Sequence, residues 1–157
     1  MYKKMFAVAA VLGLAGGMSA AQAPAPAAAA PGPATGALPR TPSPAGAKLY
    51  IVKPANGDTV KSPVTVVFGL SGMGIAPAGV QFENTGHHHL LIDTDLPANV
   101  GLPLPVTDNI KHFGKGQTEA SIELKPGKHT LQLVLGDHLH VPLLPVVASP
   151  KITITVQ

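Results

Sequence analysis

The feature that most constrains the fold is a series of short segments in which every second residue is apolar. Proline or glycine separates these segments, and no stretch repeats its apolar residues at the 3.6-residue spacing of a helix. Such alternation packs one face of a strand on a core and leaves the other in water. The predicted strands lie at 49–53, 64–70, 87–93, 118–124, 129–136 and 151–156. Six or seven strands in about 110 residues predict an all-β fold, an immunoglobulin-like antiparallel β-sandwich of about seven strands.

The polar residues between the apolar ones support this prediction, because they fall where water is expected. They are Thr65, Glu119, Ser121, Glu123, Thr130, Gln132, Thr153 and Thr155. The segment 94–111 does not fit the pattern and carries three prolines, Pro97, Pro103 and Pro105. We expect it to form a long irregular crossover, with at most one short edge strand.

The N-terminus has the order of a secretory signal peptide. Lys3 and Lys4 precede an apolar run and then small residues, so we expect a signal peptide over 1–21 with cleavage after Ala21. Residues 22–46 are almost only Ala, Pro, Gly, Ser and Thr, which predicts a disordered tether. Residues 47–157 then form one domain. The chain has no cysteine, which excludes disulfides and a lipid anchor on an N-terminal cysteine.

The net charge of +3 comes mostly from the targeting segment, because removing Lys3 and Lys4 leaves 9 basic residues (11 − 2) against 8 acidic ones. A nearly neutral chain is not a general binder of nucleic acid or anionic lipid. The apolar run is also shorter than the roughly 20 residues that span a bilayer. We therefore expect a periplasmic or secreted protein with no membrane span after signal cleavage.

Histidines gather where the predicted strands meet. In an immunoglobulin-like sandwich the strands at 87–93 and 129–136 are antiparallel neighbours, so the start of one lies beside the end of the other. This brings the triplet 87–89 close to His138 and His140. His112 just precedes the strand at 118–124, which starts at the same end, whereas His129 lies at the opposite end.

His87 and His89 point to the same face of a strand, because side chains two residues apart do so. His88 points the other way, with Leu90 and Ile92, and is expected to be a buried histidine bonded to a backbone carbonyl. Histidine is the commonest metal ligand, so the pattern predicts a metal site. The candidate ligands are His87, His89, His112, His138 and His140. Asp137 and Asp93 are candidates to orient an imidazole through its other nitrogen.

The types of ligand in the sequence narrow the choice of metal ion. An all-imidazole site suits Cu(II) or Zn(II), with Ni(II) behind them, whereas Cu(I) prefers cysteine and methionine. A blue-copper electron carrier needs a cysteine thiolate, which the chain lacks.

Three sequence motifs resemble a known family. The stretch 86–93 (GHHHLLID), His112-Phe113-Gly114 and the segment 126–131 (PGKHTL) are similar to a bacterial exported family known as domain of unknown function 4399. The resemblance implies an exported domain and brings no established activity. A second, fainter resemblance is to periplasmic copper-resistance carriers of the C type, which are immunoglobulin-like. It is carried by the turn 54–58 (PANGD) and by Asp137 with the two histidines after it, although the triple histidine is absent from those carriers.

These observations leave three functions open. The first is a protein that buffers or delivers Cu(II) or Zn(II). The second is a non-catalytic module that docks to an envelope protein or a glycan, with the histidines stabilising its loops. The third, a metalloenzyme with Glu83 or Glu119 as base, lacks a recognised motif, so we expect no enzyme. The glycine-rich loop 69–74 has no Gly-Lys-Ser/Thr and no following helix, which argues against a nucleotide site.

Overall fold

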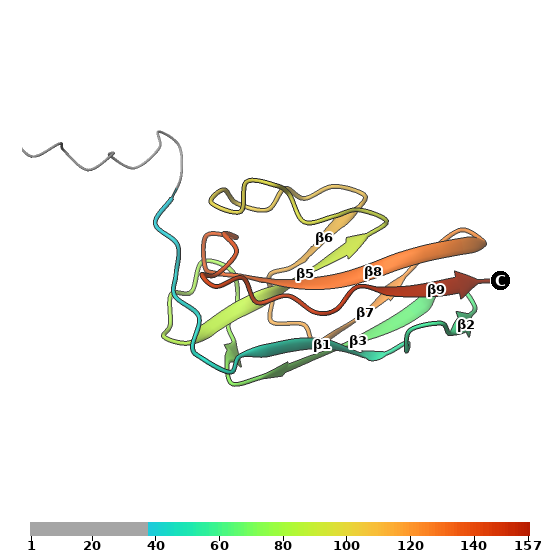
Figure 1. The fold of residues 1–157 in the computed structure, drawn as a ribbon, viewed down its shortest axis with the longest axis horizontal. Helices are drawn as coiled ribbons and strands as arrows, with labels where there is room; N and C mark the ends of the chain where they lie inside the picture. Colours follow the sequence, from blue (N-terminus) through green and yellow to red (C-terminus); the bar gives the residue numbers. More distant parts are fainter. Residues whose placement is uncertain (1–37) are drawn as a thin grey trace, which may run out of the picture. The chain divides into compact units, whose positions relative to one another are not determined.

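The structure is a computed structural model that describes residues 38–157. The signal peptide expected over 1–21 and most of the tether expected over 22–46 lie outside these residues. The described part contains nine strands (Figure 1), namely β1 (Lys48–Lys53), β2 (Thr59–Val60), β3 (Val64–Ser71), β4 (Gly74–Ile75), β5 (Thr85–Ile92), β6 (Ile110–Phe113), β7 (Glu119–Ile122), β8 (Gly127–Gly136) and β9 (Ile152–Val156). Residues 38–157 include no helix of the length and apolarity needed to cross a membrane.

The strands form two sheets, which confirms the predicted all-β sandwich. One sheet has the order β1-β3-β7, and the other has the order β2-β9-β8-β5-β4 with β6 paired to β5. The pairs are antiparallel except for β2–β9 and β4–β5, which are parallel. The expected antiparallel neighbours β5 and β8 are indeed paired, with His88 opposite Leu135 and Ile92 opposite Leu131. The count exceeds seven because β2 and β4 are two-residue strands and the crossover carries β6.

The main core lies between the two sheets and is built from the apolar faces that the alternation predicts. Val64, Val66 and Phe68 of β3 face Leu131, Leu133 and Leu135 of β8, and all are buried in one hydrophobic cluster. The alternating polar residues of β3 and β7, such as Thr65 and Ser121, are exposed. Burial of these apolar side chains is the main stabilising contribution in a domain without disulfides.

The centre of the outer face of the larger sheet is buried, whereas the alternating pattern predicts that this face is exposed to solvent. Leu91 of β5 and Val134 of β8 form a second buried cluster with Leu104 and Ile110. Leu104 belongs to the long crossover, which lies over β5 and β6 in Figure 1. The alternation rule fails here because a loop, rather than solvent, covers the second face, so that β5 is buried on both sides.

Residues 38–46 differ from the expected tether. Pro42 forms a parallel bridge with Leu144, the Ser43 amide donates to the Leu144 carbonyl at 2.9 Å, and the Leu144 amide donates to the Thr41 carbonyl at 3.0 Å. Residues 41–43, which lie inside the segment expected as a tether, are therefore paired with residue 144 in the structure. A Pro-rich segment can still pair with another segment through the backbone donors and acceptors of its other residues.

Candidate metal site

Two adjacent strands bring three histidines to the outer face of the larger sheet. His87 and His89 lie on β5 and project away from the main core, on the same face as Leu91. His89 is directly opposite His112 of β6 in the antiparallel register. On the other side of β5, His89 is opposite Val134 and His87 is opposite Gly136 at the end of β8.

The fourth histidine, His140, comes from a tight turn that follows β8. Its backbone has a φ of 67°, a conformation that only a minority of non-glycine residues adopt. Asp137 fixes this turn, since its Oδ1 accepts hydrogen bonds from the Leu139 amide at 2.9 Å and the Val141 amide at 3.0 Å. The His140 amide donates to the Asp137 carbonyl, and the His140 carbonyl accepts from Leu104 of the crossover, both at 2.9 Å. The position of His140 is thus set by backbone bonds rather than by a strand.

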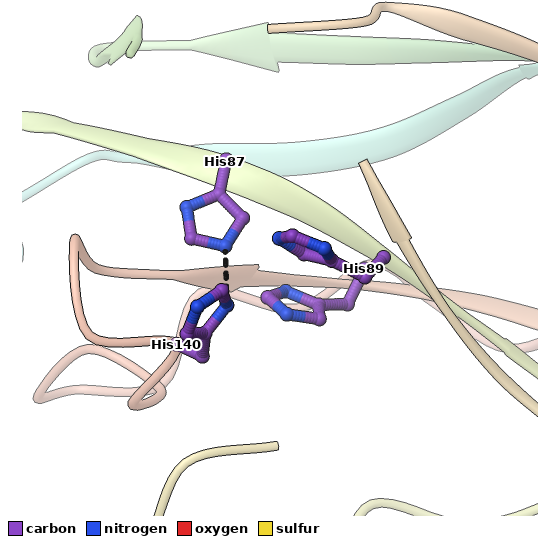
Figure 2. A group of neighbouring side chains, drawn as sticks. His87, His89 and His140 are labelled. Carbon is purple, nitrogen blue, oxygen red and sulfur yellow. Dashed lines mark hydrogen bonds between the residues drawn. The ribbon is translucent and has the colours of Figure 1, made fainter. Parts of the chain in front are cut away.

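The four imidazoles converge on one point. One ring nitrogen from each of His87, His89, His112 and His140 lies within 4.8 Å of the others. His87 Nε2 and His140 Nδ1 are 3.2 Å apart, and Figure 2 shows these two rings facing each other beside His89. Four nitrogens around one Zn(II) at about 2.0 Å would be about 3.3 Å apart, so the group would close around an ion by small ring movements.

Two glycines make room for the rings. A Cβ on Gly136 would lie 2.7 Å from His89 Cε1, and a Cβ on Gly114 would lie 2.3 Å from His112 Cε1. Contacts this short do not occur between real side chains and a Cβ, so a larger residue at either position would displace a ring. The backbone therefore leaves room for imidazoles at both positions.

The buried ring nitrogens lack hydrogen-bond partners. His87 and His89 are fully buried, whereas His112 and His140 are partly exposed. Four nitrogens of the group have no hydrogen-bond partner in the described structure: His87 Nδ1, both nitrogens of His89, and His112 Nε2. A buried polar atom without a partner is uncommon and costs about 1–3 kcal/mol, so these nitrogens are available to an ion or to water.

The environment of His87, His89 and His112 favours the neutral form of their rings. Burial lowers the pKa of His87 to about 4, with repulsion from His140 and His112 as the next causes. Burial likewise lowers the pKa of His89 to about 3, again with neighbouring histidines second. The pKa of His112 is lowered for the same reasons. Neutral imidazoles have a free lone pair, which is the form that binds a metal ion.

The structure brings together four of the five predicted ligands and places His138 outside the group. The His138 carbonyl instead accepts a hydrogen bond from the Gly79 amide at 3.0 Å. The rule that residues two apart share a face applies to strands, whereas 137–141 form a turn with a left-handed residue. The spacing that joins His87 to His89 therefore does not join His138 to His140.

The other polar residues singled out in the sequence have different roles. His88 faces the main core as expected, with Nδ1 3.1 Å from the Gln117 carbonyl and its ring against Phe68. Asp93 lies at the opposite end and bonds His129 at 2.7 Å, so it orients no ring of the group. Asp137 contacts the group's backbone turn, as described above, and not an imidazole nitrogen.

Sequence reasoning missed how His112 reaches the site. It was expected to arrive through the strand at 118–124, but that strand, β7, belongs to the other sheet. His112 instead lies on β6, whose four residues pair with β5. The sequence signal for this strand was its two apolar end residues, Ile110 and Phe113, which are both buried in the structure.

Comparison with known proteins gives one result. Residues 66–157 match the family described as "Domain of unknown function (DUF4399)", while no curated protein and no solved structure matches the chain. The matched residues contain all four histidines of the group. Because the match covers more than half of its length, the chain belongs to the DUF4399 family.

Proposed function

We propose that this protein binds one Cu(II) or Zn(II) ion through His87, His89, His112 and His140, and that it buffers or delivers that ion outside the cytoplasm. The observation that carries the proposal is the convergence of four imidazoles from β5, β6 and the turn after β8. Three separate segments contribute, so the group is not a by-product of one histidine-rich stretch. All-imidazole ligation suits these two ions.

A purely structural role for the histidines fits less well. If they only stabilised loops, their ring nitrogens would be paired with carbonyls or with one another, as His129 is paired with Asp93 and the Lys125 carbonyl. In the group, however, His87 Nε2 and His140 Nδ1 form the single ring-to-ring bond. The unpartnered nitrogens favour the metal-binding function over an envelope interaction module.

The same geometry favours binding over catalysis. A catalytic zinc site has three protein ligands and one open position, whereas four histidines would occupy all four coordination positions of a tetrahedral ion. The partial exposure of His112 and His140 gives an ion a path to the two buried ligands. We therefore propose a carrier or a buffer without enzymatic activity.

The location outside the cytoplasm is supported by the charged, apolar and small-residue order of residues 1–21. Fractionation of expressing bacteria tests this part separately. We expect the processed chain, beginning at residue 22, in the periplasm or the medium. Retention of the full-length chain in the cytoplasm would contradict it.

Calorimetric titration of the metal-stripped mature protein with Zn(II) and Cu(II) tests the binding. We expect one tight site per chain in the wild type and none in the variant carrying His87→Ala and His89→Ala. His138→Ala and His129→Ala are matched controls, because both histidines lie outside the group, and both should bind like the wild type. Equal binding by all four proteins would overturn the proposed site.

A further inference from the structure

The turn that carries His140 is held by a segment about 100 residues earlier in the chain. We call residues 40–43 the strap. Arg40 donates to the carbonyls of Pro142, at 3.0 Å, and Leu143. Together with the backbone pairing to Leu144, these bonds fix the strap along residues 142–145, immediately after the turn.

One side chain of the strap reaches the turn itself. Thr41 Oγ1 donates a hydrogen bond to Asp137 Oδ2 at 2.7 Å. The other oxygen, Oδ1, accepts from the amides of Leu139 and Val141, the residues on either side of His140. Asp137 is only 1% exposed, so its carboxylate depends on these protein donors rather than on water. The strap is thereby linked to His140 through one buried carboxylate.

We infer that Thr41 is a positioning residue of the metal site, which sets the orientation of the Asp137 carboxylate and through it the place of His140. This inference rests on the proposed function. It also extends the site beyond the residues that match the family, because the strap precedes residue 66. A protein trimmed to the matched residues would keep all four histidines and lose the group that holds one of them.

Removing the Thr41 hydroxyl leaves Asp137 Oδ2 buried without its donor. The carboxylate can then recover a partner only by rotating, which weakens its bonds to the amides beside His140. Loss of a group hydrogen-bonded to a metal ligand typically lowers metal affinity by about 10–100-fold, and because Thr41 acts one step further away, through Asp137 and the backbone, we expect a loss at the lower end of that range. We expect this loss for Thr41→Val, which keeps the side-chain shape, and recovery with Thr41→Ser, which restores the hydroxyl.

Ser43→Ala provides the matched control. Ser43 lies on the same strap and donates through Oγ to the Pro145 carbonyl at 2.8 Å, but it has no bond to Asp137. A general loosening of the strap would affect both variants, whereas a specific link to His140 would affect Thr41→Val alone. Two measurements separate these cases. Electron paramagnetic resonance of the Cu(II)-loaded protein gives the number of nitrogen ligands. Amide hydrogen exchange at Leu139 and Val141 in the metal-free protein reports whether the turn is held.

We expect Thr41→Val to lose one nitrogen ligand and to exchange faster at both amides, with Thr41→Ser and Ser43→Ala like the wild type. Unchanged ligand number, affinity and exchange in Thr41→Val would overturn the inference, as would equal losses in Ser43→Ala. If the wild type binds no metal, the proposed function fails, and with it the role of Thr41 in metal binding. The exchange rates in the metal-free proteins would then still decide whether the strap holds the turn.

Discussion

Replacing His89 by leucine should make the metal-free protein more stable. The His89 ring is fully buried, and neither of its nitrogens has a hydrogen-bond partner. A buried polar group without a partner costs about 1–3 kcal/mol, and an apolar side chain of similar size removes that cost. We therefore expect His89→Leu to raise the free energy of unfolding by about 1–3 kcal/mol. In a domain of this size each kcal/mol corresponds to a shift in the melting temperature of about 4 °C.

Metal should cancel most or all of this difference in stability between His89→Leu and the wild type. A ligand that binds only the native state at 100 times its dissociation constant adds about 2.7 kcal/mol to the stability. The wild type should gain this amount on addition of Zn(II), whereas His89→Leu should gain little. Urea unfolding of both proteins, stripped and loaded, measures all four stabilities.

His88→Leu is the control for the general effect of removing a buried histidine. His88 Nδ1 bonds the Gln117 carbonyl, and only Nε2 lacks a partner, so the gain on substitution should be smaller than at His89. Its response to metal should match the wild type, because its ring faces the main core. A metal-free His89→Leu protein that is less stable than the wild type by about 1 kcal/mol or more would refute the reasoning. It would mean that the ring of His89 makes favourable contacts and that the group is structural.

Three further predictions follow from the same site. The pKa values of His87 and His89 fall from 6.5 in the unfolded chain to about 4 and about 3 in the native state, so the unfolded chain binds more protons. The metal-free protein should therefore lose stability as the pH drops below 6.5, and equal free energies of urea unfolding at pH 6.5 and at about pH 4.5 would contradict this. Protons should also compete with Zn(II) at these two ligands only at a pH well below 6.5. At about pH 5.5 a histidine with an ordinary pKa would lower the Zn(II) affinity roughly tenfold, whereas His87 and His89 should lower it much less. Calorimetric titration with Zn(II) at about pH 7 and about pH 5.5 measures the difference. Gly136→Ala should displace the His89 ring, lowering metal affinity and costing about 1–3 kcal/mol by overpacking; Gly74→Ala, whose Cβ would meet only Thr85 Cγ2 at 3.3 Å, is the control for both measurements.

The sequence was sufficient to predict the sandwich and the proximity of most of the histidines that the structure brings together. Alternation along 87–93 separated His87 and His89 from His88, and the pairing of β5 with β8 follows from the usual strand order of such sandwiches. The end of β8 was thus correctly placed beside the start of β5, which brought His140 into reach. These conclusions depend on strand geometry, which is regular enough to be calculated from sequence.

Features outside the strands were less predictable. His138 was expected to accompany His140, but the direction of a side chain in a turn depends on backbone angles and bonds that only the fold fixes. The cover over Leu91 and Val134 comes from the crossover, whose prolines gave no sign of where it would pack. The strap has the composition of a tether, and its order depends on partners such as Asp137 that lie about 100 residues away.

X-ray absorption spectroscopy of the mature protein loaded with one equivalent of Zn(II) decides whether the four histidines hold the ion, because it reports the groups bound to the metal. We expect a first shell of four nitrogens at about 2.0 Å, with the outer-shell scattering that imidazole rings produce. In the variant carrying His87→Ala and His89→Ala this signature should disappear. A wild-type spectrum without imidazole outer-shell scattering, or one that the double substitution leaves unchanged, would show that these histidines do not hold the ion.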